Sequence, residues 1–413
     1  MNSILLQLKS NSDETKNFVN NPQITFFKSV YRRHTNFAME TFEQSFSGDI
    51  DFGKKIELTL DNYGDLVNNM ILHVKMPEIK MNNSEDTLRW VDYIGLALIQ
   101  NIKIYINNIN SGNQHLVDTH RGEWLYIDSE LNIPNDKVNA FNKMVGQFNV
   151  IDKLHHDSND VISIIQNSYQ IHKNKHNSFN LNIPLNFWFN KEFGNSLPLC
   201  ALYNAEVKII VELRPLRELI ILSSDNLTER DYFITSKPEI ELLSDYIFLD
   251  ENERKRFMDT NHEYVIEQIQ YNGQDTVICQ KDNITYANIS LKFMHPVKNI
   301  IWVTQNSSAV KNNSNDWFNY TYSGTNSDIS MIHSAKLMLD NNDRSSYRNS
   351  DFYNLVTPYK YANRTPDNIG INLYSFGLYP SLNISSGFCN FSDIESSNLL
   401  FRMNKSNIEN NDN

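Results

Sequence analysis

The sequence has few residues that could build a covalent or thiolate framework. Only three cysteines occur among 413 residues, Cys200, Cys279 and Cys389, far apart and odd in number. That count excludes a disulfide framework and a four-thiolate zinc site. Such a chain suits a reducing compartment.

Long apolar runs are also lacking. The nearest approach to one, residues 94–106, is interrupted by Gln100, Asn101 and Lys103, whereas a spanning helix needs roughly 18 apolar residues in succession. The first ten residues have neither the apolar length nor the small-residue cleavage pattern of a signal peptide. The sequence therefore predicts a chain that is neither membrane-spanning nor secreted.

The chain has fewer basic than acidic residues. The chain has 37 Lys and Arg against 49 Asp and Glu, a formal net charge of −12. Proteins that coat phosphate backbones depend on clustered cations. We therefore expect no direct contact with nucleic acid.

The common catalytic motifs are missing. The sequence contains no glycine-rich phosphate or dinucleotide loop, no His-Glu-x-x-His and no Gly-x-Ser-x-Gly. Ser308 and Lys311 match Ser-x-x-Lys, but the companion motifs are absent and a match by chance is expected in a chain of this length. We predict no catalytic residue, cofactor or metal, and no enzymatic activity.

Two histidine-containing groups have residue types that can bind a metal, because imidazole is a common ligand. His172 and His176 are four residues apart but lie in a Lys- and Asn-rich segment that favours a solvated loop. Asp118, His120 and Glu123 are closely spaced beside Trp124. For that trio a hydrogen-bonded helix start is the preferred interpretation, and a metal site the alternative.

Two basic clusters stand out in this acidic chain. The first could bind phosphate, nucleic acid or lipid headgroups, with Tyr31 and Phe37 available for stacking, and comprises Lys28, Arg32, Arg33 and His34. Because the net charge is −12, ion pairing within the chain or with another subunit is the preferred interpretation. The second lies among acidic residues and predicts a salt-bridged helix surface: Arg254, Lys255 and Arg256.

Alternation of apolar and polar residues dominates the pattern. Period two is typical of half-buried antiparallel strands, and it predicts strands at 55–60, 72–76, 102–106, 179–185, 207–213, 289–293 and 336–339. Turn clusters rich in Asn, Asp, Gly and Ser separate them, which favours a sandwich or barrel. Helices are expected only in loops, at 121–131 and 250–257, the latter capped by Asp250. The best domain boundary follows the strand at 207–213, at residues 214–224.

Several ordered segments resemble the major capsid proteins of nucleocytoplasmic large DNA viruses. They include Phe-Phe-Lys-Ser-Val-Tyr-Arg-Arg-His-Thr-Asn-Phe at 26–37, Phe-Gly-Lys-Lys at 52–55, Ile-Pro-Leu-Asn-Phe-Trp-Phe at 183–189 and Ser-Gly-Phe-Cys-Asn-Phe-Ser at 386–392. The resemblance covers most of the chain. It implies an all-β fold of two tandem jelly-roll sandwiches, with short helices in loops.

On this resemblance, the chain would be a structural capsid protein forming trimeric, pseudo-hexagonal capsomers that tile an icosahedral shell. The implied partners are further copies of itself, neighbouring capsomers, minor capsid proteins and, indirectly, an inner viral membrane. The implied location is the virion, after assembly in the host cytoplasm. The expected organisation is an N-terminal arm at 1–21, a first jelly-roll at 22–214, a linker at 215–235, a second jelly-roll at 236–403 and a polar tail at 404–413.

The C-terminal segment departs from the family pattern. Leu399 to Phe401 lead quickly into a polar tail, so the last strand of the second sandwich is expected to be missing. A split or truncated gene, a paralogue completed by another chain, and a minor capsid component all remain open as explanations. Two other functions also remain: a membrane-shaping assembly scaffold of the same fold, and a carbohydrate-binding or hydrolytic jelly-roll.

Overall fold

The computed structural model describes residues 21–29, 31–109, 112–147, 169–202, 204–279, 284–311, 313–321 and 330–403. The chain divides into two units, residues 1–37 and 38–413. The tail expected at 404–413 and nearly all of the arm expected at 1–21 lie outside the described residues.

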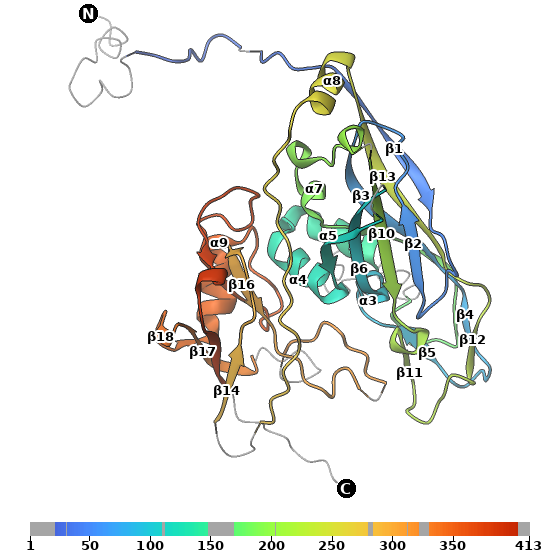
Figure 1. Ribbon diagram of the computed structural model, residues 1–413. Helices are drawn as coiled ribbons and strands as arrows, with labels where there is room; N and C mark the ends of the chain where they lie inside the picture. Colours follow the sequence, from blue (N-terminus) through green and yellow to red (C-terminus); the bar gives the residue numbers. More distant parts are fainter. Residues whose placement is uncertain are drawn as a thin grey trace, which may run out of the picture. The chain divides into compact units, whose positions relative to one another are not determined.

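Two four-stranded antiparallel sheets form the first sandwich (Figure 1). One sheet has the order β1-β13-β3-β9, with bounds Phe37–Ser45, Glu239–Leu249, Leu66–Met76 and Phe179–Pro184. The other has the order β2-β10-β6-β7, with bounds Lys55–Thr59, Ala205–Leu213, Ile99–Asn108 and Gln114–His120.

Alternation places matched rows of apolar side chains between these sheets. In the first sheet two rows run Leu242–Leu72–Ile183 and Ile240–Val74–Leu181. In the second they run Leu58–Ile209–Ile104 and Ile56–Val211–Ile102. All twelve side chains are buried in one core. Burial of a large aliphatic side chain contributes about 1.5–3 kcal/mol, so these rows fix the strand register.

Smaller sheets and helices extend the first sandwich. The small sheets are β11-β5, with bounds Ile220–Leu222 and Leu88–Trp90, and β12-β4-β8, with bounds Tyr232–Ile234, Ile79–Met81 and Lys175–His176. The helices are α3 (Ile94–Leu98), α4 (Gly122–Asn132), α5 (Asn135–Val145), α7 (Trp188–Lys191) and α8 (Glu251–Asp259). Short 3-10 turns lie at Phe193–Asn195, Leu199–Ala201 and Leu216–Glu218.

The second sandwich is built around a sheet with the order β14-β22-β17-β18, in which β19 also pairs with β17. Its strands span Thr285–Ser290, Ser397–Met403, Ile332–Leu339, Asn342–Asp343 and Arg348–Asn349. Two ribbons complete it: β15-β21, at Pro296–Val297 and Cys389–Asn390, and β16-β20, at Asn299–Trp302 and Asn372–Ser375. A π-turn at Phe352–Val356 leads into α9 (Thr357–Tyr361), and a 3-10 turn lies at Phe391–Asp393.

Most of the sequence-based elements are confirmed. The strand expected at 102–106 lies within β6 and that at 207–213 within β10, while the expected strand at 289–293 overlaps only the end of β14. Both expected helices form, as α4 and α8, and Asp250 caps α8 by accepting a hydrogen bond from the Glu253 N–H at 2.9 Å. Helix α5 was not expected. Val138, Phe141 and Val145 recur along it at helical spacing, a pattern that the strand-based interpretation overlooked.

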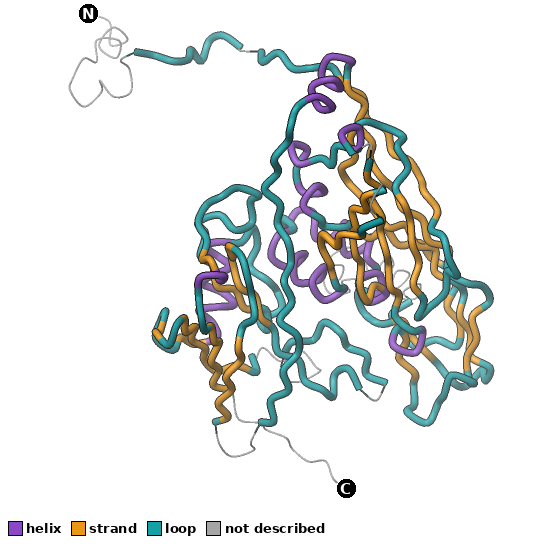
Figure 2. Tube along the Cα trace, viewed as in Figure 1, coloured by secondary structure: helices purple, strands orange, loops and turns teal. Residues whose placement is uncertain are grey.

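The predicted domain boundary is wrong. Residues 215–235 are not a linker, because β11 pairs with β5 and β12 with β4. Strand β13 then lies between β1 and β3, so the first sandwich continues to Leu249. The sequence signals at Arg214 and Pro215 mark a turn, not a boundary. In the described chain the crossing to the second sandwich comes after α8, through an extended segment at 260–279 (Figure 2).

The last described strand, β22, lies between β14 and β17 and is paired on both sides. Its own edges are therefore not open. Whether the second sandwich lacks a strand stays a prediction.

Replacing Gly122 should destabilise the protein. A Cβ at this position, where α4 begins, would overlap the carbonyl oxygens of Leu96 and Ile99. We expect Gly122→Ala to cost about 3 kcal/mol, because overpacking against fixed backbone cannot relax. Urea unfolding measures this cost. Gly194→Ala is the control, because a Cβ there meets nothing within 4 Å, and an equal loss in both variants would contradict the prediction.

Candidate functional site: the joint between the two sandwiches

An aromatic cluster joins the two sandwiches. Phe318, from the second half, stacks on Tyr126 of α4 with ring centroids 4.6 Å apart, and meets Tyr93 edge-on at 5.9 Å. Tyr320 and Ile371, also from the second half, are buried in the same core as the first sandwich. Burial raises the pKa of Tyr126 well above its ordinary value, so its hydroxyl stays neutral.

A buried ion pair lies beside this cluster. The Arg364 guanidinium contacts the Glu130 carboxylate at 2.9 Å, and both side chains are less than 10% exposed. The same Glu130 oxygen accepts the Asp367 backbone N–H at 2.9 Å, and the Arg364 N–H donates to the Leu131 carbonyl at 3.0 Å. Burial raises the pKa of Glu130, whereas the charge of Arg364 lowers it. The pair therefore binds α4 to the loop after α9.

A second cation occupies the other end of the joint. Arg214, at the end of β10, bonds the Glu123 carboxylate and lies 3.8 Å above the Trp317 ring. The Trp317 indole N–H donates to the Glu218 carbonyl at 2.8 Å. A guanidinium between a carboxylate and an aromatic face suits a partly desolvated contact.

Two asparagine side chains of the second half hydrogen-bond to the backbone of β11, as a neighbouring strand would. The Asn313 amide accepts from the Leu222 N–H at 2.9 Å and donates to the Leu222 carbonyl at 2.8 Å. Asn315 donates to the Ile220 carbonyl at 2.8 Å. Both asparagines have positive φ, a conformation that Asn tolerates better than most residues. The second half thus covers the backbone of β11.

The extended segment at 260–279, which we call the connector, is held against the first sandwich (Figure 2). Its Ile269 N–H donates to the Asp118 carboxylate at 3.2 Å, and its Gln268 amide donates to the Val117 carbonyl at 2.5 Å. Glu267 pairs with Lys191 of the first sandwich at 3.2 Å and with Lys298 of the second. One carboxylate therefore bridges both halves.

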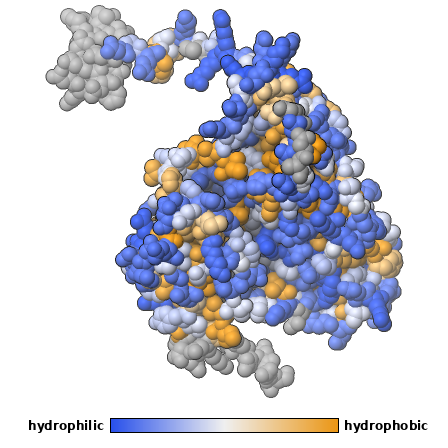
Figure 3. All heavy atoms as spheres, viewed as in Figure 1, coloured by the Kyte–Doolittle hydropathy of each residue, from blue (hydrophilic) through white to orange (hydrophobic). Residues whose placement is uncertain are grey.

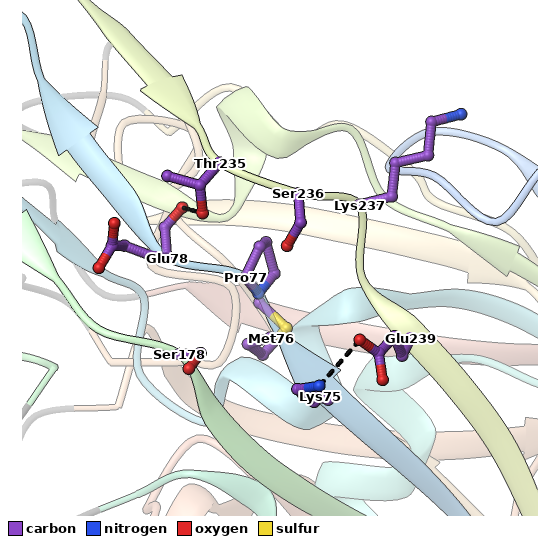
Figure 4. A pocket seen from close by; sticks show the side chains of 9 residues that line it. All are labelled: Lys75, Met76, Pro77, Glu78, Ser178, Thr235, Ser236, Lys237 and Glu239. Carbon is purple, nitrogen blue, oxygen red and sulfur yellow. Dashed lines mark hydrogen bonds and ion pairs between the residues drawn. The ribbon is translucent and has the colours of Figure 1, made fainter.

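A shallow pocket of about 250 Å³ lies where β3 ends and β13 begins (Figure 4). It is lined by Lys75, Met76, Pro77, Glu78, Ser178, Thr235, Ser236, Lys237 and Glu239. Its charges are paired with each other or with nearby residues: Lys75 with Glu239 at 2.8 Å, and Glu78 with Lys80 and Lys175 at 2.7 Å each. Lys237 points away and bonds Asp49 at 2.5 Å. The pocket offers ion pairs that already satisfy one another.

Most of the candidate site residues suggested by the sequence lie apart from one another in the structure. His172 is exposed, but His176 is not in a solvated loop: it is 3% exposed in β8 and its ring bonds the Leu88 carbonyl at 2.9 Å. That part of the loop interpretation is wrong, because β8 pairs with β4 and turns the ring inward. Ser308 and Lys311 are both exposed in a turn region.

The trio at 118–123 does not act as one group. Asp118 and His120 are buried on β7 and in contact at 3.0 Å, and the His120 ring stacks on Phe187. Glu123 instead pairs with Arg214. In the parts of the chain that the structure describes, no cluster of three or more His, Cys, Asp or Glu residues could hold a metal ion.

The second basic cluster behaves largely as predicted. Arg254 contacts Asp65 at 2.7 Å, and Lys255 contacts Glu251 one helical turn away at 2.7 Å. In the first cluster, Lys28, Arg32 and Arg33 are exposed and form no ion pair with any residue that the structure describes. None of the described helices is long and apolar enough to cross a membrane.

Comparison with known proteins agrees with this architecture. Residues 25–250 match the family model described as the major capsid protein N-terminus, and residues 253–412 match that of the large eukaryotic DNA virus major capsid protein. The chain belongs to the major capsid protein family of large eukaryotic DNA viruses. The two models meet at α8, where the strand pairing also ends the first sandwich.

Relatives in this capsid protein family match nearly the whole chain. The major capsid protein of Phaeocystis pouchetii virus is 30% identical, covering 98% of this chain and 94% of its own. That of Paramecium bursaria Chlorella virus 1 is also 30% identical, with 92% and 82% covered. The chain is a structural capsid protein.

Solved structures give the fold. VP54 of PBCV-1 is 28% identical with a TM-score of 0.73, covering 92% of this chain and 87% of that one. The Faustovirus major capsid protein has a TM-score of 0.70 at 13% identity, with 93% and 89% covered, which shows shared fold alone. The two sandwiches are the jelly-rolls of a double jelly-roll.

Removing the Arg364 side chain should destabilise the protein, and the size of the loss should depend on pH. Arg364→Ala leaves Glu130 buried without its partner, and we expect a loss of about 3–5 kcal/mol in urea unfolding near neutral pH. The pKa of Glu130 then rises further, and a carboxyl whose pKa is raised on folding loses stability as pH rises through that pKa. The deficit should therefore be smaller at about pH 5 than at about pH 8.

Lys255→Ala is the matched control, because it removes an exposed ion pair worth under about 0.5 kcal/mol. A deficit in Arg364→Ala that does not change with pH would show that Glu130 is not the group left uncompensated.

Asp118 should hold the connector. Asp118→Ala leaves the Ile269 N–H without its acceptor, a loss of about 1–3 kcal/mol, and it also removes the carboxylate that contacts His120. Glutamyl endopeptidase, which cuts after Glu263 and Glu267, should then cleave the connector roughly tenfold faster under native conditions. Asp275→Ala, an exposed change in the same segment, should leave the rate unchanged, and equal cleavage of both variants would refute the role of Asp118.

Proposed function

We propose that this chain forms trimeric, pseudo-hexagonal capsomers that tile an icosahedral shell. The observation that carries this proposal is the joint: two jelly-rolls are fixed to one another by buried aromatic stacking and the Glu130–Arg364 pair. Three copies of a rigid two-sandwich unit present six similar edges, which suits a hexagonal lattice built from one chain.

In this proposal the protein acts through interfaces and performs no catalytic step. Neighbouring capsomers and minor capsid proteins are its partners, and an inner viral membrane is reached only through them. Its net charge of −12 opposes direct contact with packaged nucleic acid, since phosphate backbones repel an acidic surface. Assembly takes place in the host cytoplasm, and the product remains in the virion.

The mass of the purified chain tests the capsomer. Light scattering should give three times 48.2 kDa, and electron microscopy of that species should show a hexagonal outline. A monomer at all concentrations would contradict the trimer.

Purified particles should also contain the chain in stoichiometric amounts, whereas an assembly scaffold of the same fold would be lost from mature particles.

A further inference from the structure

Residues 21–36, between the arm expected at 1–21 and strand β1, include three large aromatic side chains, and from here on we call residues 21–36 the arm. Phe26, Phe27 and Tyr31 are 90%, 98% and 89% exposed. The described part of the arm forms no strand or helix, although Thr, Phe and Tyr are residues that favour strands. Figure 3 shows hydrophilic and apolar side chains together on it. Exposed aromatic residues in such a segment indicate a surface that another chain covers.

The arm also differs in charge from the rest of the protein. It contains Lys28, Arg32 and Arg33 and no acidic residue, a net charge of +3. The remainder of the chain therefore carries −12 − 3 = −15. Other copies of this chain are thus electrostatically complementary to the arm.

Strand β1 offers a place for such an arm. It lies at the end of the order β1-β13-β3-β9, and among the described strands only β13 pairs with it. Phe37 and Met39 are 55% and 39% exposed, and Glu40 and Glu43 are exposed along the same strand. An unpaired strand edge has free backbone donors and acceptors that another extended segment can satisfy.

We propose that the arm of one copy adds a strand to the free edge of β1 in a second copy. The inference rests on the proposed function, which brings many copies side by side. The arm's 16 residues, fully extended, reach roughly 53–58 Å, more than the roughly 30 Å length of the nine-residue β1. Its cations then lie near Glu40 and Glu43, and its aromatic rings near Phe37 and Met39. An anionic membrane would also attract the arm, but lipids cannot supply a ladder of backbone partners.

Cross-linking between distinguishable full-length copies tests the exchange. One copy carries Phe27→Cys and a tag that alters its mass, and the other carries Met39→Cys. A short bis-maleimide should join them into a species of combined mass. Phe27→Cys mixed with Tyr359→Cys is the control, because Tyr359 is 81% exposed on α9. Joining no faster than in this control, or joining only within one chain that carries both changes, would overturn the proposal.

Charge reversal gives an independent readout. The double variant Arg32→Glu with Arg33→Glu should dissociate at a protein concentration roughly tenfold higher than the wild type does. The double variant Glu40→Lys with Glu43→Lys should show the same increase. Combining all four should restore it. Lys137→Glu with Lys143→Glu makes the same change of charge on exposed positions of α5 and should have no such effect.

The outcomes separate the arm from the shell role. If the arm-reversed chain assembles as tightly as the wild type and loses only binding to phosphatidylserine vesicles, the arm is a membrane segment and the exchange is wrong, while the capsomer stands. If the wild-type chain stays monomeric, the capsomer proposal itself fails.

Discussion

Burial of Glu130 against Arg364 at one joint constrains the rest of the chain, because the carboxylate would be buried without compensation if that guanidinium were lost. Each is nearly removed from solvent, and a rearrangement that parted them while Glu130 stayed buried would leave its carboxylate uncompensated, whereas Arg364 also contacts the exposed Asp367 carboxylate at 2.9 Å. Beside this pair, Phe318 stacks on Tyr126, so the aromatic rings of the two halves must also pack against each other. Polar groups as well as apolar side chains therefore hold the two sandwiches together.

The joint also explains why the connector needs no regular structure. Its backbone and side chains are held at separate points by Asp118, by Val117 and by the two lysines around Glu267. A helix would pair the backbone groups of the connector with one another, and a strand would pair them with a neighbouring strand, so the Ile269 N–H would not be available to Asp118. An extended segment can instead follow the surface of one sandwich and still meet the other.

Local patterns in the sequence were informative where the physics is local. Alternation predicted β6 and β10 closely, and the Asp250 cap predicted the start of α8. The boundary failed because β13 is separated from its partner β3 by well over a hundred residues, and no local signal shows such pairing. Glu130 and Arg364 were missed for the same reason: each is an ordinary charged residue until the fold brings it to its partner. His176 was placed outside because its neighbours are polar, whereas one strand pair turns its ring inward.

The place of β13 between β1 and β3 has a consequence for synthesis. Strand β3 ends at Met76 and β13 ends at Leu249, so 249 − 76 = 173 residues must be translated before the gap in that sheet is filled. At typical elongation rates of about 5–20 residues per second this takes roughly 9–35 s. Throughout that time the edges of β1 and β3 that β13 will cover stay unsatisfied in the nascent chain. A chain needed in large numbers thus has its most aggregation-prone interval during translation, and any chaperone that assists it should act before residue 249 leaves the ribosome.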